Sequence, residues 1–195
     1  MYVFDLDGTL VDSVDAHVKA WVEALAALGV NAREEEVRPL MGLPAGEIAR
    51  RLLPGRAKEL ADLKVRLFLE KYINYVKPYD DVGAVELLPR PIAVVTSSSG
   101  VLARAILKRI GLGVDYVIGG DEVPRGKPNP DPLYLLSSMA GVPPRLMVVV
   151  GDSEYDVEMA RAAGARPICI ARGREPCRGD VEVVTTLYAL IGARG

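Results

Sequence analysis

The chain has 195 residues, half of them hydrophobic and 26% charged, with a formal net charge of −2. This length and balance are typical of one α/β core with room for a small insertion. A charge this small gives no basic field for nucleic acid, and no apolar run reaches the length of a membrane span. The start of the chain lacks the basic segment and cleavage site of a secretory signal, so we expect a cytoplasmic protein.

Two carboxylates follow the first predicted strand. Tyr2–Phe4 is short and apolar, and Asp5 and Asp7, two positions apart in an extended segment, project to the same side. Neighbouring carboxylates repel one another, and a shared proton or a hard divalent cation such as Mg²⁺ relieves the repulsion. Gly8 then allows a turn without a Cβ clash. Taken alone, this pattern fits an Asp-rich turn as well as a metal site.

Residues 14–79 show helical periodicity and no convincing strand. We expect an all-helical insertion there, placed directly after the carboxylate pair, where it can close over a site. Among its cations, Arg38 is a candidate to contact the leaving group of a substrate, and a surface ion pair is the alternative. The expected helices are Val14–Leu28, Glu34–Leu40, Ala45–Leu53 and Arg56–Val76.

From residue 80 onwards, short apolar strands alternate with helices. This alternation predicts an α/β fold with a doubly wound parallel sheet, formed by residues 1–13 and 80–195, whose ligand crevice lies at the carboxyl ends of the strands. The expected strands are Ile92–Val95, Tyr116–Ile118, Met147–Val150, Ile168–Ile170 and Val181–Val184. The expected helices are Gly100–Ile110, Asp131–Ala140, Ser153–Ala163 and Thr185–Ile191.

Polar residues follow two of these strands. Thr96 and Ser97 lead into a helix whose N-terminal amides can bind a phosphate, and simple helix capping is the alternative. Asp152 stands at the next such strand end, with Asp156 one helical turn further on, as candidate metal ligands or as a cap and a surface carboxylate. Lys127 lies in a turn-rich loop between them, where it is either solvated or folded toward the crevice as a phosphate-binding cation.

The combination of these segments is much more specific than any one of them. In this order they resemble the haloacid dehalogenase superfamily of phosphohydrolases, and the resemblance covers essentially the whole chain. The helical insertion looks like the C1-type cap found in phosphoglycolate phosphatases and β-phosphoglucomutases. The segments are Asp5-Leu6-Asp7-Gly8-Thr9, Thr96-Ser97, Lys127 and Gly151-Asp152-Ser153-Glu154-Tyr155-Asp156.

The resemblance implies a Mg²⁺-dependent phosphatase for a small phosphomonoester such as phosphoglycolate or a sugar phosphate. Asp5 would be the nucleophile that forms an aspartyl-phosphate, and Asp7 the general acid and base. The implied phosphate-binding residues are Gly8, Thr96, Ser97 and Lys127. The implied metal-binding residues are Asp5, Asp7 through its backbone carbonyl, Asp152 and Asp156.

Three other functions compete with this one. Dehalogenases of this superfamily lack a carboxylate at the position of Asp7. His17, Ala20 and Trp21 form an HxxAW pattern similar to that of β-phosphoglucomutases, although His17 in a packing role explains it as well. Those mutases usually carry a glutamate where this chain has Gly151, which favours the hydrolase. A binding module without activity would first lose the acidic and lysine residues that this chain keeps.

Cys169 and Cys177 are the only cysteines, and their spacing matches no metal site. The chain has no glutamine and three asparagines, a depletion seen in proteins of hyperthermophiles, in which intracellular disulfides occur. Two free thiols and one structural disulfide therefore both fit the sequence. A monomer and a homodimer fit it equally.

Overall fold

Parallel strands form the six-stranded central sheet of the computed structural model, which describes residues 1–173 and 177–192. The predicted α/β fold with a parallel sheet is therefore confirmed. Each strand is only three to five residues long, and the central ones are buried on both faces. In spatial order the strands are β5 (Tyr116–Ile118), β4 (Ile92–Val95), β1 (Tyr2–Phe4), β6 (Val148–Gly151), β7 (Arg166–Ile170) and β8 (Glu182–Val184).

Helices cover both faces of the sheet, as a doubly wound topology requires. Successive strand residues point to opposite faces, so Phe4 packs in one core layer and Val3 in the other. Helix α5 (Gly100–Ile110) belongs to the layer of Phe4. Helices α6 (Asp131–Ala140) and α7 (Glu154–Ala163) belong to the layer of Val3.

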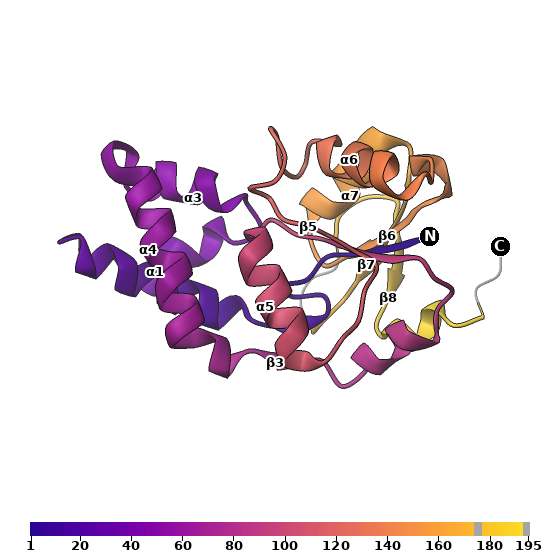
Figure 1. The fold of residues 1–195 in the computed structure, drawn as a ribbon, viewed down its shortest axis with the longest axis horizontal. Helices are drawn as coiled ribbons and strands as arrows, with labels where there is room; N and C mark the ends of the chain where they lie inside the picture. The colour runs from indigo at the N-terminus through magenta and orange to yellow at the C-terminus, as the bar shows by residue number, and fades with distance from the viewer. Residues whose placement is uncertain (174–176, 193–195) are drawn as a thin grey trace.

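The segment from Val14 to Tyr75 forms a group of helices beside the sheet, which we call the helical part (Figure 1). It has a hydrophobic core of its own, in which Trp21, Ile48 and Leu60 are buried. Its α-helices are α1 (Val14–Ala27), α2 (Glu34–Val37), α3 (Ala45–Leu52) and α4 (Ala57–Glu70). Short 3₁₀ turns connect or extend them: η1 (Arg38–Leu40), η2 (Pro54–Arg56) and η3 (Tyr72–Tyr75).

Two expected helices of this part are shorter than predicted. The helix expected over 34–40 becomes the 3₁₀ turn η1 from Arg38 onwards, because Pro39 supplies no amide for a helical hydrogen bond. The helix expected over 56–76 is interrupted at Lys71, where the chain turns and brings Tyr72 back to the core with its hydroxyl on Glu23. Neither break alters the hydrophobic periodicity, so periodicity alone did not reveal them.

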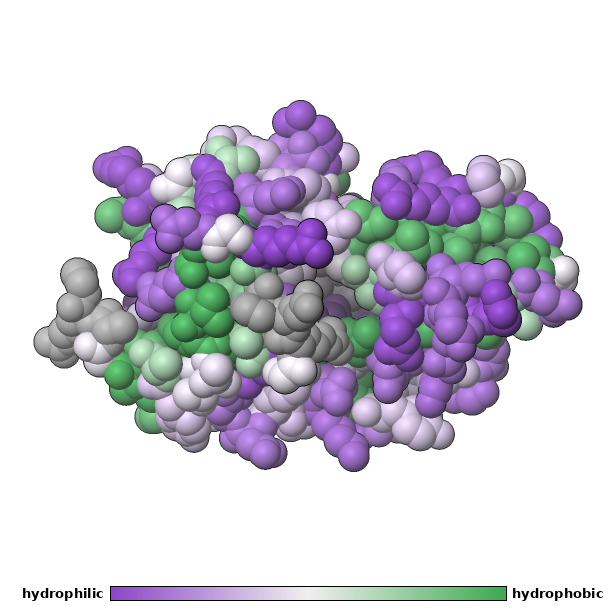
Figure 2. All heavy atoms as spheres, turned by 180° about the vertical axis from the view of Figure 1, so that it is seen from behind, coloured by the Kyte–Doolittle hydropathy of each residue, from purple (hydrophilic) through white to green (hydrophobic). Residues whose placement is uncertain are grey.

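The two linkers that join the helical part to the sheet lie side by side. Strand β2 (Val11–Asp12) pairs antiparallel with β3 (Lys77–Pro78), with Val11 opposite Pro78. The expectation of no strand over 14–79 is wrong at this point, because a pair of two-residue strands leaves no periodic pattern. In the space-filling view an indentation marks where the helical part meets the sheet (Figure 2).

The end of the chain adds one strand and one turn. The helix expected over 185–191 is the 3₁₀ turn η6 (Leu187–Leu190). Earlier in the chain, two further 3₁₀ turns precede β4 and β6: η4 (Val82–Leu87) and η5 (Pro144–Leu146). Cys169, buried on β7, forms a disulfide with Cys177, which decides between the two alternatives left open by the sequence. No helix within the described ranges is both long and apolar enough to cross a membrane.

We expect the double variant Cys169→Ser/Cys177→Ser to lose about 2 to 3 kcal/mol of unfolding free energy, because the disulfide closes a short loop in the unfolded chain. Urea unfolding with and without reductant measures this loss. The wild-type protein in reductant should approach the double variant, which itself should not respond. Free thiols in the purified wild type, with a stability indifferent to reductant, would contradict the assignment.

Candidate active site

Acidic and hydroxyl residues leave the carboxyl ends of three adjacent strands. Asp5 follows β1, Thr96 follows β4 and Asp152 follows β6, and these strands are neighbours in the sheet. The ladder continues just past the strand ends, since the Asp5 amide donates to the Val150 carbonyl at 2.9 Å. The sheet order therefore brings together residues that are up to 147 positions apart in the sequence.

A cavity of about 230 Å³ lies between these strand ends and the helical part. On the sheet side its lining residues are Asp5, Asp7, Thr96, Ser97, Ser98, Lys127, Asp152 and Ser153. On the helical side they are Val14, His17, Trp21, Met41, Gly42, Leu43, Ala45, Ile48 and Lys64.

Lys127 lies buried between two carboxylates. Its Nζ is 2.6 Å from Asp5 Oδ1 and 2.5 Å from Asp156 Oδ1, and its side chain is 3% exposed. The loop that carries Lys127 thus folds toward the crevice, the functional alternative of the two considered from the sequence. Burial disfavours the ammonium, but Asp156 and Asp5 outweigh it and raise the pKa of Lys127.

Asp5, Asp152 and Asp156 form an acidic cluster in which one carboxylate oxygen from each lies within 4.8 Å of the others. Burial raises the pKa of Asp5 well above its ordinary value; Lys127 opposes this, and the other two carboxylates add to it. Three carboxylate oxygens this close together fit a hard divalent cation such as Mg²⁺. Asp7 is expected to bind the metal through its backbone carbonyl, and its side chain is not part of the cluster.

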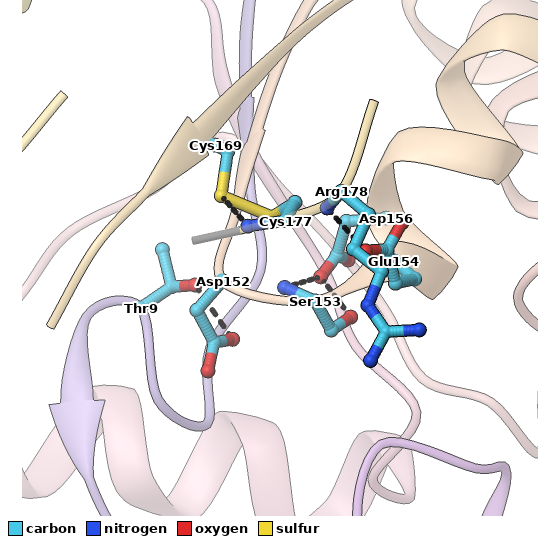
Figure 3. Close-up of a disulfide and its surroundings, with 8 residues drawn as sticks. All are labelled: Thr9, Asp152, Ser153, Glu154, Asp156, Cys169, Cys177 and Arg178. Atoms are coloured by element: carbon cyan, nitrogen blue, oxygen red, sulfur yellow. Dashed lines mark hydrogen bonds between the residues drawn. A yellow bond between two sulfur atoms is a disulfide. The ribbon is translucent and has the colours of Figure 1, made fainter. Parts of the chain in front are cut away.

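Two glycines leave room for these carboxylates. A Cβ at Gly8, whose φ is +91°, would lie 2.3 Å from Asp152 Oδ2, and a Cβ at Gly151 would lie 2.3 Å from Asp156 Cγ. Gly8 therefore backs the acidic cluster, and it is not among the residues that line the cavity. Its predicted contact with phosphate has no support in this position. Figure 3 shows Asp152, Ser153 and Asp156 as they leave the end of β6.

The carboxylate of Asp7 accepts hydrogen bonds on both oxygens. Ser13 Oγ and His17 Nε2 lie 2.5 and 2.9 Å from Oδ1. Ser98 Oγ and Thr96 Oγ1 lie 2.7 and 3.3 Å from Oδ2. Burial opposes ionisation of Asp7, but His17 and the serine hydroxyls outweigh it and hold its pKa far below the ordinary range.

His17 links Asp7 to a buried lysine of the helical part. Its Nδ1 is 2.7 Å from Lys64 Nζ, so His17 donates to Asp7 from Nε2 and accepts from Lys64. The Lys64 ammonium also lies 5.1 Å from the centre of the Phe68 ring and 5.4 Å from that of Trp21. Burial lowers the pKa of Lys64 to about 8, although Asp7 opposes the change.

The structure does not bring Arg38 to the cavity. Its guanidinium binds Asp15 at 2.6 Å and Glu34 at 3.3 Å on the surface, and it is not a lining residue. Since α2 ends at Val37, Arg38 lies on the outer side of a 3₁₀ turn. The expectation that it contacts the leaving group is therefore corrected in favour of the surface ion pair.

One amide at the start of α5, where a phosphate site is expected, already has a partner. The amide of Gly100, the first residue of α5, donates to Asp121 Oδ1 at 2.8 Å. Ser97 nevertheless lines the cavity, and its hydroxyl donates to the Gly42 carbonyl of the helical part at 2.8 Å. Ser97 thus joins the two sides of the cavity.

The sequence analysis missed three residues of the site. Lys64 lines the cavity, and the hydroxyls of Ser13 and Ser98 bind Asp7. For Lys64 a signal existed: it stands four residues after Leu60 and four before Phe68, in an otherwise apolar stripe of α4. A lysine in such a stripe is either paired in the core or directed into a cavity. Ser13 and Ser98 carried no comparable signal, because serine is common at helix starts.

A model of the family described as "Haloacid dehalogenase-like hydrolase" matches residues 2–170. The phosphoglycolate phosphatase of Neisseria meningitidis is 32% identical over 189 residues, covering 87% of this chain and 79% of that protein. The fructose-1-phosphate phosphatase YqaB of Escherichia coli is 33% identical over 171 residues, covering 83% of this chain and 91% of YqaB. The crystal structure of CbbY from Rhodobacter sphaeroides in complex with phosphate has a TM-score of 0.81 at 25% identity, covering 97% and 95% of the two chains.

Because the pKa of Lys64 is lowered in the folded protein, we expect Lys64 to make the free energy of unfolding rise with pH. Between about pH 8 and 10.5 the unfolded chain holds a proton on Lys64 that the folded chain has lost. One pKa unit is worth about 1.4 kcal/mol, so the unfolding free energy should gain about 3 kcal/mol over this interval. Urea unfolding across the interval measures it.

Lys64→Met should abolish this gain. Lys58→Met, which removes an exposed lysine of the same helix, should retain it. Parallel pH curves for the wild type and Lys64→Met would contradict the burial of a titrating ammonium at this position.

Proposed function

Because the chain belongs to the haloacid dehalogenase-like hydrolase family, we propose that it is a Mg²⁺-dependent phosphatase that hydrolyses a small phosphomonoester through an aspartyl-phosphate. One observation carries the proposal: Asp5, held by Lys127, lies in a cavity next to the carboxylates of Asp152 and Asp156. This arrangement supplies a nucleophile, a cation for the phosphoryl oxygens and ligands for a divalent metal.

In the first step, Asp5 Oδ bonds to phosphorus while the bond from phosphorus to the leaving oxygen breaks. Lys127 contacts Asp5 directly, so it orients the nucleophile and offsets charge on the phosphoryl group. Mg²⁺, held by Asp5, Asp152 and Asp156, would supply the remaining positive charge. Thr96 and Ser97 lie at the end of the neighbouring strand, where their polar groups can bind phosphoryl oxygens.

Asp7 acts as acid in the first step and as base in the second. Without ligand it is ionised, which suits the base that takes a proton from the water attacking the aspartyl-phosphate. A phosphate dianion bound beside it disfavours the charged form and so promotes the protonated acid that serves the leaving oxygen. Ser13 and His17 hold the carboxylate in place for both steps.

The geometry at Gly151 favours hydrolysis over the mutase alternative. β-Phosphoglucomutases usually carry a glutamate at this position, and here the carboxylate of Asp156 occupies the space of any side chain. His17 does not separate the two functions, since it contacts Asp7 and would serve either one. A binding role without catalysis stays a further alternative, and the loss of activity on substitution of Asp5 tests it.

The helical side of the cavity indicates a compact leaving group. Val14, Met41 and Ile48 give it an apolar wall, on which the hydroxyls of a hexose would lose their hydrogen bonds to water. Lys64 is the one ammonium among the lining residues on this side. We therefore propose a short anionic substrate of the phosphoglycolate type rather than a sugar phosphate, with its carboxylate near Lys64.

Residues 14–79 are proposed as the cap over a catalytic core formed by residues 1–13 and 80–195. The paired linkers β2 and β3 give it one narrow attachment, and the contact of Ser97 with Gly42 closes it on the core. Cap closure excludes water from the reacting groups. The cytoplasmic location, the thermophilic character and the choice between monomer and homodimer stay predictions.

Phosphate release from phosphoglycolate, hexose phosphates and p-nitrophenyl phosphate tests the proposed function. Release should require Mg²⁺, stop with a chelator and fall at least about a thousandfold in Asp5→Asn, because an amide does not form the phosphoenzyme. Asp12→Asn, at an exposed carboxylate on β2, is the matched control and should keep its activity. An Asp5→Asn variant as active as the wild type would refute the proposal.

The proposed substrate contact predicts different effects on activity for substitutions of Lys64 and of Arg38. Lys64→Met should lower kcat/KM about tenfold more for phosphoglycolate than for p-nitrophenyl phosphate, because only the former brings a carboxylate to the ammonium. Arg38→Met should change both values equally and by less than about twofold. Equal losses on both substrates in Lys64→Met would count against Lys64 as a specificity residue.

A further inference from the structure

Arg172 lies outside the cavity, yet its side chain is bonded to the turn that carries Asp7. Arg172 comes two residues after β7, and its side chain is only 7% exposed. Its Nη2 and Nε both donate to the carbonyl oxygen of Thr9, at 2.7 and 3.2 Å. A guanidinium that is buried beside a single carbonyl holds the position of that peptide group closely.

The same guanidinium binds the linker that returns from the helical part. Its Nη1 donates to Asp81 Oδ2 at 2.7 Å, and its central carbon lies 4.2 Å from the centre of the Tyr79 ring. The amide of Tyr79 in turn donates to the Leu10 carbonyl at 3.1 Å. Arg172 therefore joins the turn after the nucleophile to the linker that follows β3.

Thr9 passes this restraint on to the acidic cluster. Its side-chain hydroxyl lies 3.3 Å from Asp152 Oδ1 (Figure 3). A Cβ added at the preceding residue, Gly8, would overlap the same carboxylate. Thr9 is fully buried. The turn around it is closed by two hydrogen bonds, because the amides of Leu10 and Val11 both donate to the Leu6 carbonyl, at 3.0 and 3.1 Å. A shift of the Thr9 peptide would displace both the turn and its contact with Asp152.

Arg172 is itself restrained by its place in the chain. It lies within the loop that the Cys169–Cys177 disulfide closes. On one side Cys169 stands on β7 opposite Gly151 of β6, and on the other the Arg178 amide donates to Glu154, the first residue of α7 (Figure 3). Both ends of the loop are thus fixed beside the strand end that carries Asp152.

We propose that Arg172 is a positioning residue for the reaction, which acts by holding the Thr9 carbonyl and, through it, the turn that orients Asp7 and Asp152. This inference rests on the proposed phosphatase function. It assigns to Arg172 no contact with substrate. Its removal should slow the chemical step and leave substrate affinity nearly unchanged.

The test compares Arg172→Met, Arg172→Lys and Arg90→Met with the wild type. Arg90 is the matched control, because its side chain also joins a carboxylate, Asp115, to a backbone carbonyl, that of Gly113, but does so next to the start of β4. Rates of phosphate release are taken per folded molecule, well below the unfolding temperature of each variant. Fluorescence of Trp21, the single tryptophan and a cavity residue, reports binding of inorganic phosphate in the presence of Mg²⁺.

Arg172→Met should lower kcat at least about tenfold, with KM and the phosphate Kd within about threefold of wild type. Arg172→Lys should recover part of the loss, because one ammonium can still donate to Thr9. Arg90→Met should keep kcat. Unchanged kcat in both Arg172 variants, or a rise in KM and Kd without a fall in kcat, would overturn the proposal.

Amide hydrogen exchange gives a readout that does not depend on turnover. In Arg172→Met the amides of Leu10 and Val11 should exchange at least about tenfold faster, while those of Ile92–Val95 stay protected. Unchanged exchange in the turn would overturn the positioning role whatever the activity. If the wild type releases no phosphate from any substrate, the proposed function fails, and the exchange data still decide whether Arg172 holds the turn.

Discussion

Carboxylates crowd the carboxyl ends of β1 and β6, where burial makes negative charge costly unless cations offset it. Lys127 supplies one such cation by binding Asp5 and Asp156 together. The loop from β5 to α6 must therefore fold over the sheet edge, since it alone carries this lysine. The acidic cluster still places three carboxylates beside this one lysine, which accounts for the fit of a divalent metal.

Space is the second constraint on this edge of the sheet. Gly8 and Gly151 stand where any Cβ would overlap a carboxylate of the acidic cluster. Because Gly151 lies on β6, paired with β1 and β7, the strand cannot shift to relieve such an overlap without disturbing the sheet. The same tight packing that positions the carboxylates thus also excludes a longer side chain from this site.

The helical part contributes to the site through buried polar contacts rather than through its surface cations. His17 and Lys64 extend from Asp7 into the core of that part, so movement of its helices is coupled to the carboxylate. Arg172 restrains the two linkers that join the helical part to the sheet, because it binds Thr9 before β2 and Asp81 after β3. The Asp7 turn is held from both sides, by α1 and α4 above the cavity and by the loop after β7 beside it.

The sequence by itself determined the strand–helix alternation and the polar residues at the strand ends, because periodicity and motif spacing are local properties of the chain. It also predicted Asp5 at the crevice, since parallel strands end at the same edge, and it left open whether the loop of Lys127 folds toward it. Only the tertiary structure decided that Lys64 enters the cavity while Arg38 stays on the surface. It also decided the disulfide and the bonds of Arg172. Each of these depends on which distant segments of the chain become neighbours in the fold, and local sequence patterns do not contain that information.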